Sequence, residues 1–351
     1  MIDKRKFYIN GKWVDPVIKK DFKVINPSNE SPYAFISLGG KEDVNTAVDS
    51  AKEAFVEWSQ VSKKIKIKLL EKLLQIYRAR WEEITTTMSQ EMGAPIDWSS
   101  SAQTASGADH INDFIKCLKD FQFEKKFDNK SNNFIVYEPI GVCALITPWN
   151  WPINQITLKV IPALASGCSM ILKPSEIAPL SGMLFAEIID EAGFPPGVFN
   201  LINGDGDSVG TELSTHPDID MISFTGSTRA GALISQNAAK DFKRVSLELG
   251  GKGANIIFKD ADPEAIERGA LRCFRNSGQS CNAPTRMLVE KSMYNEAIER
   301  LKKYTENFEV GDPKKEGEHI GPVISETQYN KIQTLIQKGI DEGAKLVAGG
   351  T

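Results

Sequence analysis

The chain has 351 residues, of which 41% are hydrophobic and 25% are charged, as in globular proteins with a substantial core. Its formal net charge of -4 gives no electrostatic reason to expect binding to nucleic acid or to an anionic membrane. Apolar runs such as 142–146 are far too short to span a bilayer. We therefore expect a cytoplasmic protein with neither nucleic acid nor membrane among its partners.

The cysteines and histidines restrict the chemistry. The cysteines are odd in number, widely spaced and without a C-x-x-C pair, and the three histidines also lack ligand spacing, so we expect neither a disulfide framework nor a metal site. Catalysis would then depend on cysteine, carboxylate, lysine and amide groups. The cysteines are Cys117, Cys143, Cys168, Cys273 and Cys281.

The first 140 residues show a hairpin, helices and a second hairpin. The pair Asn10-Gly11 lies between two short apolar runs and suits a type I′ turn. Apolar residues recur at helical spacing from about 44 to 92, and another helix is expected from about 102 to 119. The charged and aromatic stretch at about 121–139 is interpreted as a projecting hairpin.

From Gly141 onward, short apolar runs alternate with helical segments. This alternation predicts a parallel, doubly wound α/β sheet, Rossmann-like, whose ligands bind beyond the carboxyl ends of the strands. A second series begins after Gly250-Gly251, so we place a domain boundary there, giving domains 1–249 and 250–351. The expected strands are 142–147, 170–172, 198–202, 221–224 and 245–247, and the expected helices are 152–166, 180–192, 207–215 and 227–239.

Two glycine-containing segments are candidates for phosphate binding. Gly204, Gly206 and Gly210 form G-x-G-x-x-x-G, one residue longer than the dinucleotide fingerprint, and a plain strand-to-helix turn explains them equally well. The segment Phe224–Ser227 lies where an expected strand meets an expected helix. Its backbone N–H groups could hold a pyrophosphate, whereas a simple N-cap by Ser227 is the alternative.

Five segments, taken together, resemble the aldehyde dehydrogenase superfamily in their order, residue identities and spacing. The resemblance extends from the opening 8–13 to the end of the chain, and Glu248 and Cys281 lie 33 residues apart within two of the segments. The five are 147–152 (TPWNWP), 172–176 (LKPSE), 224–227 (FTGS), 247–252 (LELGGK) and 278–286 (GQSCNAPTR).

The resemblance implies an NAD(P)-dependent oxidation of an aldehyde to a carboxylic acid. Cys281 would be the nucleophile, because a thiolate readily makes the tetrahedral adduct that hydride transfer requires. Asn150 and the backbone N–H of Cys281 would stabilise the oxyanion, although Asn150 could instead form an Asx turn. Glu248 would be the general base that activates water, and Lys159 would position groups of the site. The other cysteines are expected in the core.

The resemblance also implies a set of cofactor contacts. Lys173 and Glu176 match positions that hold the adenosine ribose, and Glu176 would repel a 2′-phosphate, so NAD is favoured and NADP remains possible. Among the glycines of 204–210, Gly206 fits the family's cofactor glycine best. The remaining expected contacts are Thr147, Pro148, Trp149, Phe224, Gly226, Ser227 and Leu249.

Family members continue past the point that corresponds to Thr351, with an acidic-aromatic segment that contacts the nicotinamide ribose. The resemblance therefore implies that the catalytic domain is incomplete at its C-terminus, that the full-length protein is a homodimer or homotetramer, and that residues 1–351 alone are nearly inactive and poorly soluble. One alternative is a truncated, non-catalytic dinucleotide-binding fragment. Another is a CoA-acylating semialdehyde dehydrogenase, against which Glu248 argues because CoA supplies its own nucleophile.

Overall fold

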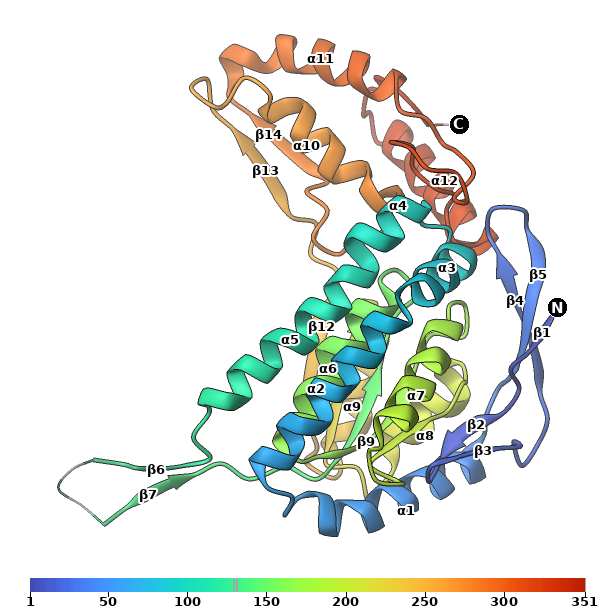
Figure 1. Cartoon of the computed structure of the whole chain (residues 1–351). Helices are drawn as coiled ribbons and strands as arrows, with labels where there is room; N and C mark the ends of the chain where they lie inside the picture. The colour runs from blue at the N-terminus through green and yellow to red at the C-terminus, as the bar shows by residue number, and fades with distance from the viewer. Residues whose placement is uncertain (129, 131, 351) are drawn as a thin grey trace.

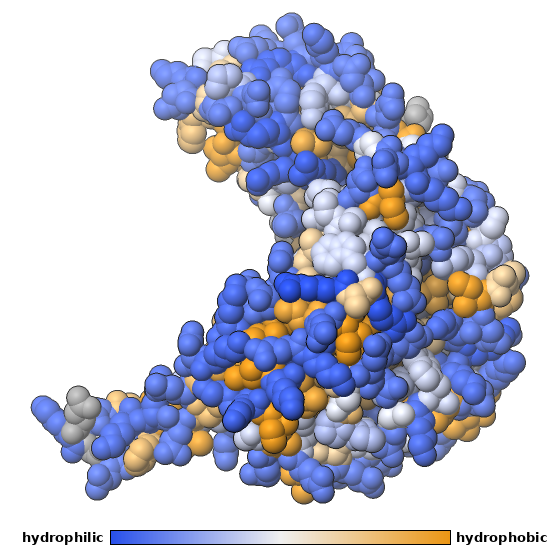
Figure 2. Space-filling model, viewed as in Figure 1, coloured by the Kyte–Doolittle hydropathy of each residue, from blue (hydrophilic) through white to orange (hydrophobic). Residues whose placement is uncertain are grey.

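The computed structural model describes residues 1–128, 130 and 132–350. The residues up to 249 are called the large part and residues 250–350 the small part (Figure 1). The space-filling view shows a deeply hollowed surface between them (Figure 2). Within the described residues, no helix is both long enough and apolar enough to cross a membrane.

The chain begins with five short strands. The expected hairpin is present, with Asn10 and Gly11 at φ 51° and 71°, as a type I′ turn requires. The pair formed by the fourth and fifth strands was not anticipated from the sequence. The strands are β1 (Ile2–Asp3), β2 (Phe7–Ile9), β3 (Lys12–Val14), β4 (Asp21–Asn26) and β5 (Ser31–Ser37).

The stretch at about 44–92 that was expected to be helical forms three helices. The helix that follows them begins irregularly. Ser62 caps the second helix through its side chain, and Gly93, at φ 80°, ends the third in the left-handed conformation typical of glycine. A π-helical turn precedes α5. The elements are α1 (Lys41–Trp58), α2 (Lys63–Ala79), α3 (Trp81–Met92), α4 (Ile96–Trp98), η1 (Ser99–Thr104) and α5 (Ala105–Asp120).

A two-stranded antiparallel ribbon projects from the large part (Figure 1). It comprises β6 (Glu124–Lys126) and β7 (Phe134–Val136), within the stretch expected to form a hairpin; positions 129 and 131 of that stretch lie outside the described residues. The apolar side chains of Phe127, Phe134 and Val136 are exposed on it.

The main sheet has the strand order β12-β11-β8-β9-β10-β2-β3. Its first five strands are mutually parallel, and the β2–β3 hairpin extends the sheet by antiparallel pairing with β10. This is the parallel arrangement that the alternating pattern predicts. The central strands are β8 (Val142–Ile146), β9 (Ser169–Lys173), β10 (Phe199–Leu201), β11 (Met221–Gly226) and β12 (Arg244–Leu249).

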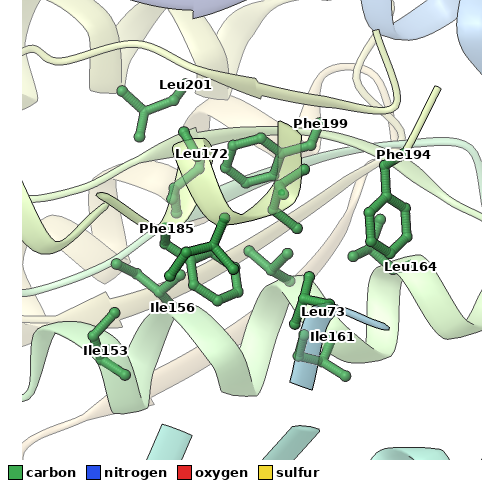
Figure 3. Close-up of a cluster of buried hydrophobic side chains, with 14 of the residues drawn as sticks. Leu73, Ile153, Ile156, Ile161, Leu164, Leu172, Phe185, Phe194, Phe199 and Leu201 are labelled. Carbon is green, nitrogen blue, oxygen red and sulfur yellow. The ribbon is translucent and has the colours of Figure 1, made fainter. Parts of the chain in front are cut away.

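Helices cover both faces of this sheet. One face carries the larger core, in which Leu73 of α2 and Phe185 of α7 meet Leu172 and Phe199 of the sheet (Figure 3). Each such fully buried side chain stabilises the fold by about 1.5–3 kcal/mol relative to its exposed state. The helices between the strands are α6 (Pro152–Ser166), α7 (Leu180–Ala192), the π-helical turn η2 (Gly206–Gly210) with α8 (Thr211–Thr215), and α9 (Thr228–Ala239).

The small part is built on a parallel pair of strands. Its core contains the buried Ile257, Ile266 and Ala297, while Ile256 and Leu288 of the same strands are more than half exposed. The elements are β13 (Ala254–Ile257), α10 (Ala265–Phe274), the 3-10 turn η3 (Arg275–Gly278), β14 (Arg286–Val289), the 3-10 turn η4 (Lys291–Met293), α11 (Tyr294–Glu306) and α12 (Glu326–Asp341).

Candidate active site

The sequence-predicted residues gather at the carboxyl ends of neighbouring parallel strands. The segment 147–151 follows β8, and Glu248 lies near the end of β12, opposite Thr225 of β11. The loop that carries Cys281 follows η3 and comes from the small part. Parallel strands point their carboxyl ends to one edge of the sheet, and the small part brings the cysteine loop to that edge.

Asn150 is bound directly to the loop that precedes Cys281. Its side-chain Nδ2 donates to the carbonyl of Gln279 at 2.7 Å, and Trp151 Nε1 donates to Ser280 Oγ at 2.8 Å. One N–H of the Asn150 amide is thereby engaged, and the second remains for another acceptor. The structure therefore places the candidate oxyanion donor against the backbone two residues before the candidate nucleophile.

Cys281 is exposed, with a free thiol. The turn before it is tightly wound, since Asn276, Ser277 and Gly278 have φ angles of 55°, 57° and 72°. Two consecutive non-glycine residues in the left-handed region carry strain, which is common where the backbone holds a functional group.

The other cysteines do not all lie in the core. Cys143 and Cys168 are buried and Cys273 is partly buried, but Cys117 is exposed on α5, so its expected core position was wrong. The Cys143 thiol donates to Cys168, which lowers the pKa of Cys168 to about 6. Burial nevertheless withholds that sulfur from a substrate.

Lys159 lies beneath the site, on α6. Its Nζ donates to Ser223 Oγ of β11 at 3.0 Å. Burial lowers the pKa of Lys159 to about 8, and the carboxylate of Glu248 acts in the opposite direction. Lys159 and Glu248 therefore interact electrostatically, while Glu248 itself remains exposed.

Lys173 and Glu176 form a pair at the end of β9. Lys173 is buried and donates to the carbonyls of Gly204 and Pro174 at 2.6 and 3.1 Å, and its Nζ lies 3.7 Å from a carboxylate oxygen of Glu176. Burial lowers the pKa of Lys173, an effect that Glu176 opposes. The Glu176 side chain is about a quarter exposed, so a ligand can reach it.

The phosphate-binding candidates differ in how closely they are packed. A Cβ on Gly226 would lie 2.4 Å from the ring of Phe224, so only glycine fits there, whereas the Cβ position of Gly206 is open. Ser227 Oγ accepts from the N–H of Ala230 at 3.3 Å, which is the N-cap that the simpler interpretation predicted. Leu249 packs beside Gly231 of α9.

Two buried hydroxyls fit an additional ligand at this edge. Thr147 Oγ1 and Thr225 Oγ1 have no hydrogen-bond partner among the described residues, and both lie at the carboxyl ends of their strands. Pro148 and the partly buried Trp149 follow Thr147, and Trp149 packs against the buried cluster that contains Met92 and Ile324. Since buried polar groups are normally paired, the two hydroxyls fit a cofactor that supplies the missing partner.

A cavity of about 360 Å³ opens beside η3, the turn that precedes the cysteine loop, and is lined by Trp98, Arg275 and Asn276 among others. The Trp98 ring packs edge-on against Trp151 at 5.9 Å, and the Arg275 guanidinium lies 5.0 Å from the Trp98 ring centre. Its size is within the range of small-molecule sites. A larger cavity of about 620 Å³ lies at the N-terminal strands, lined by Asp3, Lys4 and Arg5 among others, and none of its lining residues belongs to the site.

Sequence reasoning did not identify Gln103 or Asn276, which are buried beside Asn150 and contact it. Asn276 had a weak local signal, because it lies two residues before the segment 278–286 that contains Cys281. Gln103 had none, since its position depends on the π-helical turn η1.

The family model for the aldehyde dehydrogenase family matches residues 13–351. The chain belongs to the aldehyde dehydrogenase family. It is 49% identical to a 3-succinoylsemialdehyde-pyridine dehydrogenase of Pseudomonas, with 100% of this chain and 73% of that protein covered. A putative aldehyde dehydrogenase of Staphylococcus saprophyticus is 42% identical, with 98% of this chain and 72% of that protein covered.

Solved aldehyde dehydrogenase structures have the same fold over this length. One from Bartonella henselae is 59% identical with a TM-score of 0.99, covering 100% of this chain and 74% of that chain. Aldehyde dehydrogenase C from Pseudomonas syringae, a cysteine-to-alanine mutant in complex with NAD+ and octanal, is 45% identical with a TM-score of 0.96, covering 99% and 71%.

Proposed function

We propose that this aldehyde dehydrogenase homologue oxidises an aldehyde to a carboxylic acid with NAD as the preferred cofactor. The observation that carries the proposal is the 2.7 Å hydrogen bond from Asn150 to the carbonyl of Gln279, two residues before Cys281. This bond fixes an amide donor against the loop that carries an exposed thiol, at the carboxyl edge of a parallel sheet. Glu248 lies at the same edge, on β12.

The first step is addition of the Cys281 thiolate to the aldehyde carbon, which converts the carbonyl oxygen into an anion. The free N–H of the Asn150 amide and the backbone N–H of Cys281 donate to that oxygen. Loss of one such donor typically slows a reaction about 10²–10³-fold.

NAD supplies, when bound, the acceptor for the hydride that leaves the tetrahedral carbon. The carbon then remains attached to Cys281 as a thioester. Glu248, exposed to solvent, accepts a proton from water as the water attacks the thioester. The carboxylic acid is released, and the electron pair of the broken C–S bond returns to the Cys281 thiolate.

The cofactor preference rests on Glu176 and Lys173. The Glu176 carboxylate accepts hydrogen bonds from ribose hydroxyls and repels a 2′-phosphate, while Lys173 lies beside it at 3.7 Å. Gly226 and Ser227 lie at the N-terminus of α9, where a pyrophosphate binds favourably. NADP would bind more weakly than NAD.

The β6–β7 ribbon supports a homodimer or homotetramer. Phe127, Phe134 and Val136 expose apolar surface on an element that projects away from the core, and such surface favours association. Sedimentation velocity of the wild type and of a triple Ser variant at these positions tests this assembly, and a monomeric wild type would contradict it.

The enzymatic alternative is transfer of the acyl group to CoA, and the non-catalytic alternative is dinucleotide binding alone. Incubation with propanal or octanal and NAD, with and without CoA, distinguishes the three by NADH absorbance. We expect NADH formation that is slow for residues 1–351 alone and does not depend on CoA, because Glu248 supplies a base for attack by water. Strict dependence on CoA would favour acyl transfer, and NAD binding without turnover would overturn the enzymatic proposal for this chain.

A further inference from the structure

Gln103 connects the two parts of the molecule at the active site. It is fully buried on η1, and its Nε2 lies 3.0 Å from Asn276 Oδ1 and 3.3 Å from the backbone oxygen of Asn150. The same nitrogen lies 3.1 Å from Met92 Sδ. Because the carbonyl of Asn150 is an acceptor only, the amide must present its N–H₂ group to this junction.

Asn276 completes the connection from the other side. Its Nδ2 donates to the same Asn150 carbonyl at 3.0 Å, and its own carbonyl accepts from Gln279 Nε2 at 3.2 Å. Gln279 Oε1 in turn accepts from the N–H of Ile324. Among the described residues, Gln103 is the one donor of a hydrogen bond to Asn276 Oδ1. Removal of the Gln103 amide therefore leaves that buried oxygen unpaired.

The backbone explains why a glutamine can reach this position. A π-helical turn inserts an extra residue into the helix and re-aims the side chains of that turn. The Oε1 of Gln103 is buried and has no hydrogen-bond partner among the described residues. The polar contacts of the side chain are therefore all donated by Nε2, and apart from the contact with Met92 Sδ they go to Asn150 and Asn276.

We propose that Gln103 is a positioning residue that fixes Asn150 relative to Cys281, an inference that rests on the proposed function. It touches neither of the two reacting groups directly and acts through Asn276 and the Asn150 carbonyl. A misplacement of about 1 Å at such a site can slow the reaction about 10²-fold. Gln103 should therefore affect kcat far more than KM.

Gln103→Met tests this role, because methionine keeps the length and apolar volume of the side chain and removes its N–H₂ group. Thr104→Val is the matched control. Thr104 follows on the same turn and is also fully buried, but its hydroxyl pairs with Thr85 rather than with the cysteine loop. We expect Gln103→Met to lower kcat about 10–100-fold with KM for octanal within about twofold, and Thr104→Val to retain wild-type kcat.

Amide hydrogen exchange gives a second measurement that needs no turnover. In Gln103→Met the backbone of 276–281 should exchange faster, while β13 remains unchanged; Thr104→Val should alter neither. An unchanged kcat in an active Gln103→Met enzyme, or unchanged exchange at 276–281, would overturn the proposal. An inactive wild type would contradict the proposed function, and exchange would still decide the role of Gln103.

Discussion

The ammonium group of Lys159 lies in surroundings that disfavour its charge. Its environment was not readable from the sequence, where it appears as one lysine on an apolar helix. Cys281, Glu248 and Asn150 could be proposed from the sequence because each lies in a distinctive local segment. Gln103 was not, because its partners Asn150 and Asn276 are 47 and 173 residues away in the chain.

The buried Lys159 should make stability depend on pH. Its pKa falls from 10.5 to about 8 because burial penalises the charged form. Below about pH 8 the buried charged lysine destabilises the fold to its full extent. As pH rises towards 10.5 the unfolded state binds more protons than the folded state, so folding becomes more favourable. Relative to Lys159→Met, the wild type should gain about 2–3 kcal/mol between about pH 7 and pH 10. Urea denaturation measures this difference, and parallel pH profiles would contradict it.

Glu176 should determine the cofactor preference. Glu176→Thr removes the negative charge that repels a 2′-phosphate and should shift the ratio of NAD to NADP affinity towards NADP by about tenfold, or ~1.4 kcal/mol. Isothermal titration with each cofactor measures the ratio. Glu191→Thr is the control, since it makes the same charge change at the exposed C-terminal end of α7. An equal shift in both variants would mean that Glu176 does not face the ribose.

At the scale of elements, two glycines lie where the small part contacts the C-terminal end of α3. Ser277 Oγ donates to the carbonyl of Gly321 at 2.7 Å, and a Cβ on Gly321 would collide with the backbone oxygen of Gly93. The strands and helices of the main sheet were predictable because apolar runs alternate there. The strands β4 and β5 and the turn η1 were not, since their pairing and register depend on tertiary contacts.

Gly321→Ala should therefore weaken the attachment of the small part. The added methyl group forces backbone atoms apart, and we expect a loss of about 1–3 kcal/mol in the free energy of unfolding. Gly339→Ala is the control, because that glycine is inside α12 with no atom near its Cβ position. Alanine there should be neutral or stabilise by up to ~1 kcal/mol. Equal effects of the two substitutions in urea denaturation would contradict the account.

For the molecule as a whole, the two parts differ in how much apolar surface they bury. The large part has extensive cores on both faces of its sheet, whereas the small part is built around Ile257, Ile266 and Ala297. The parallel sheet itself was predictable from the sequence. The difference in burial was not, because it depends on which faces of β13 and β14 the chain covers.

This difference should appear in local stability. Backbone amides of β13 and β14 should exchange with solvent deuterium faster than those of β8 and β9, because local opening is easier where fewer apolar contacts must break. Mass spectrometry of peptides from the 351-residue chain measures the rates. Equal protection of the two pairs of strands would show that the molecule opens as one cooperative unit.

The central claim, covalent catalysis by Cys281 with Glu248 as the base, is tested most directly by trapping the thioester. Glu248→Gln keeps the shape of the side chain but cannot take the proton from water, so mixing with octanal and NAD should leave an acyl group on the enzyme. We expect mass spectrometry of the digested protein to show about one octanoyl group per chain, on the peptide that contains Cys281, together with one equivalent of NADH. An unmodified Cys281, or an acyl group on Cys117 instead, would contradict the account.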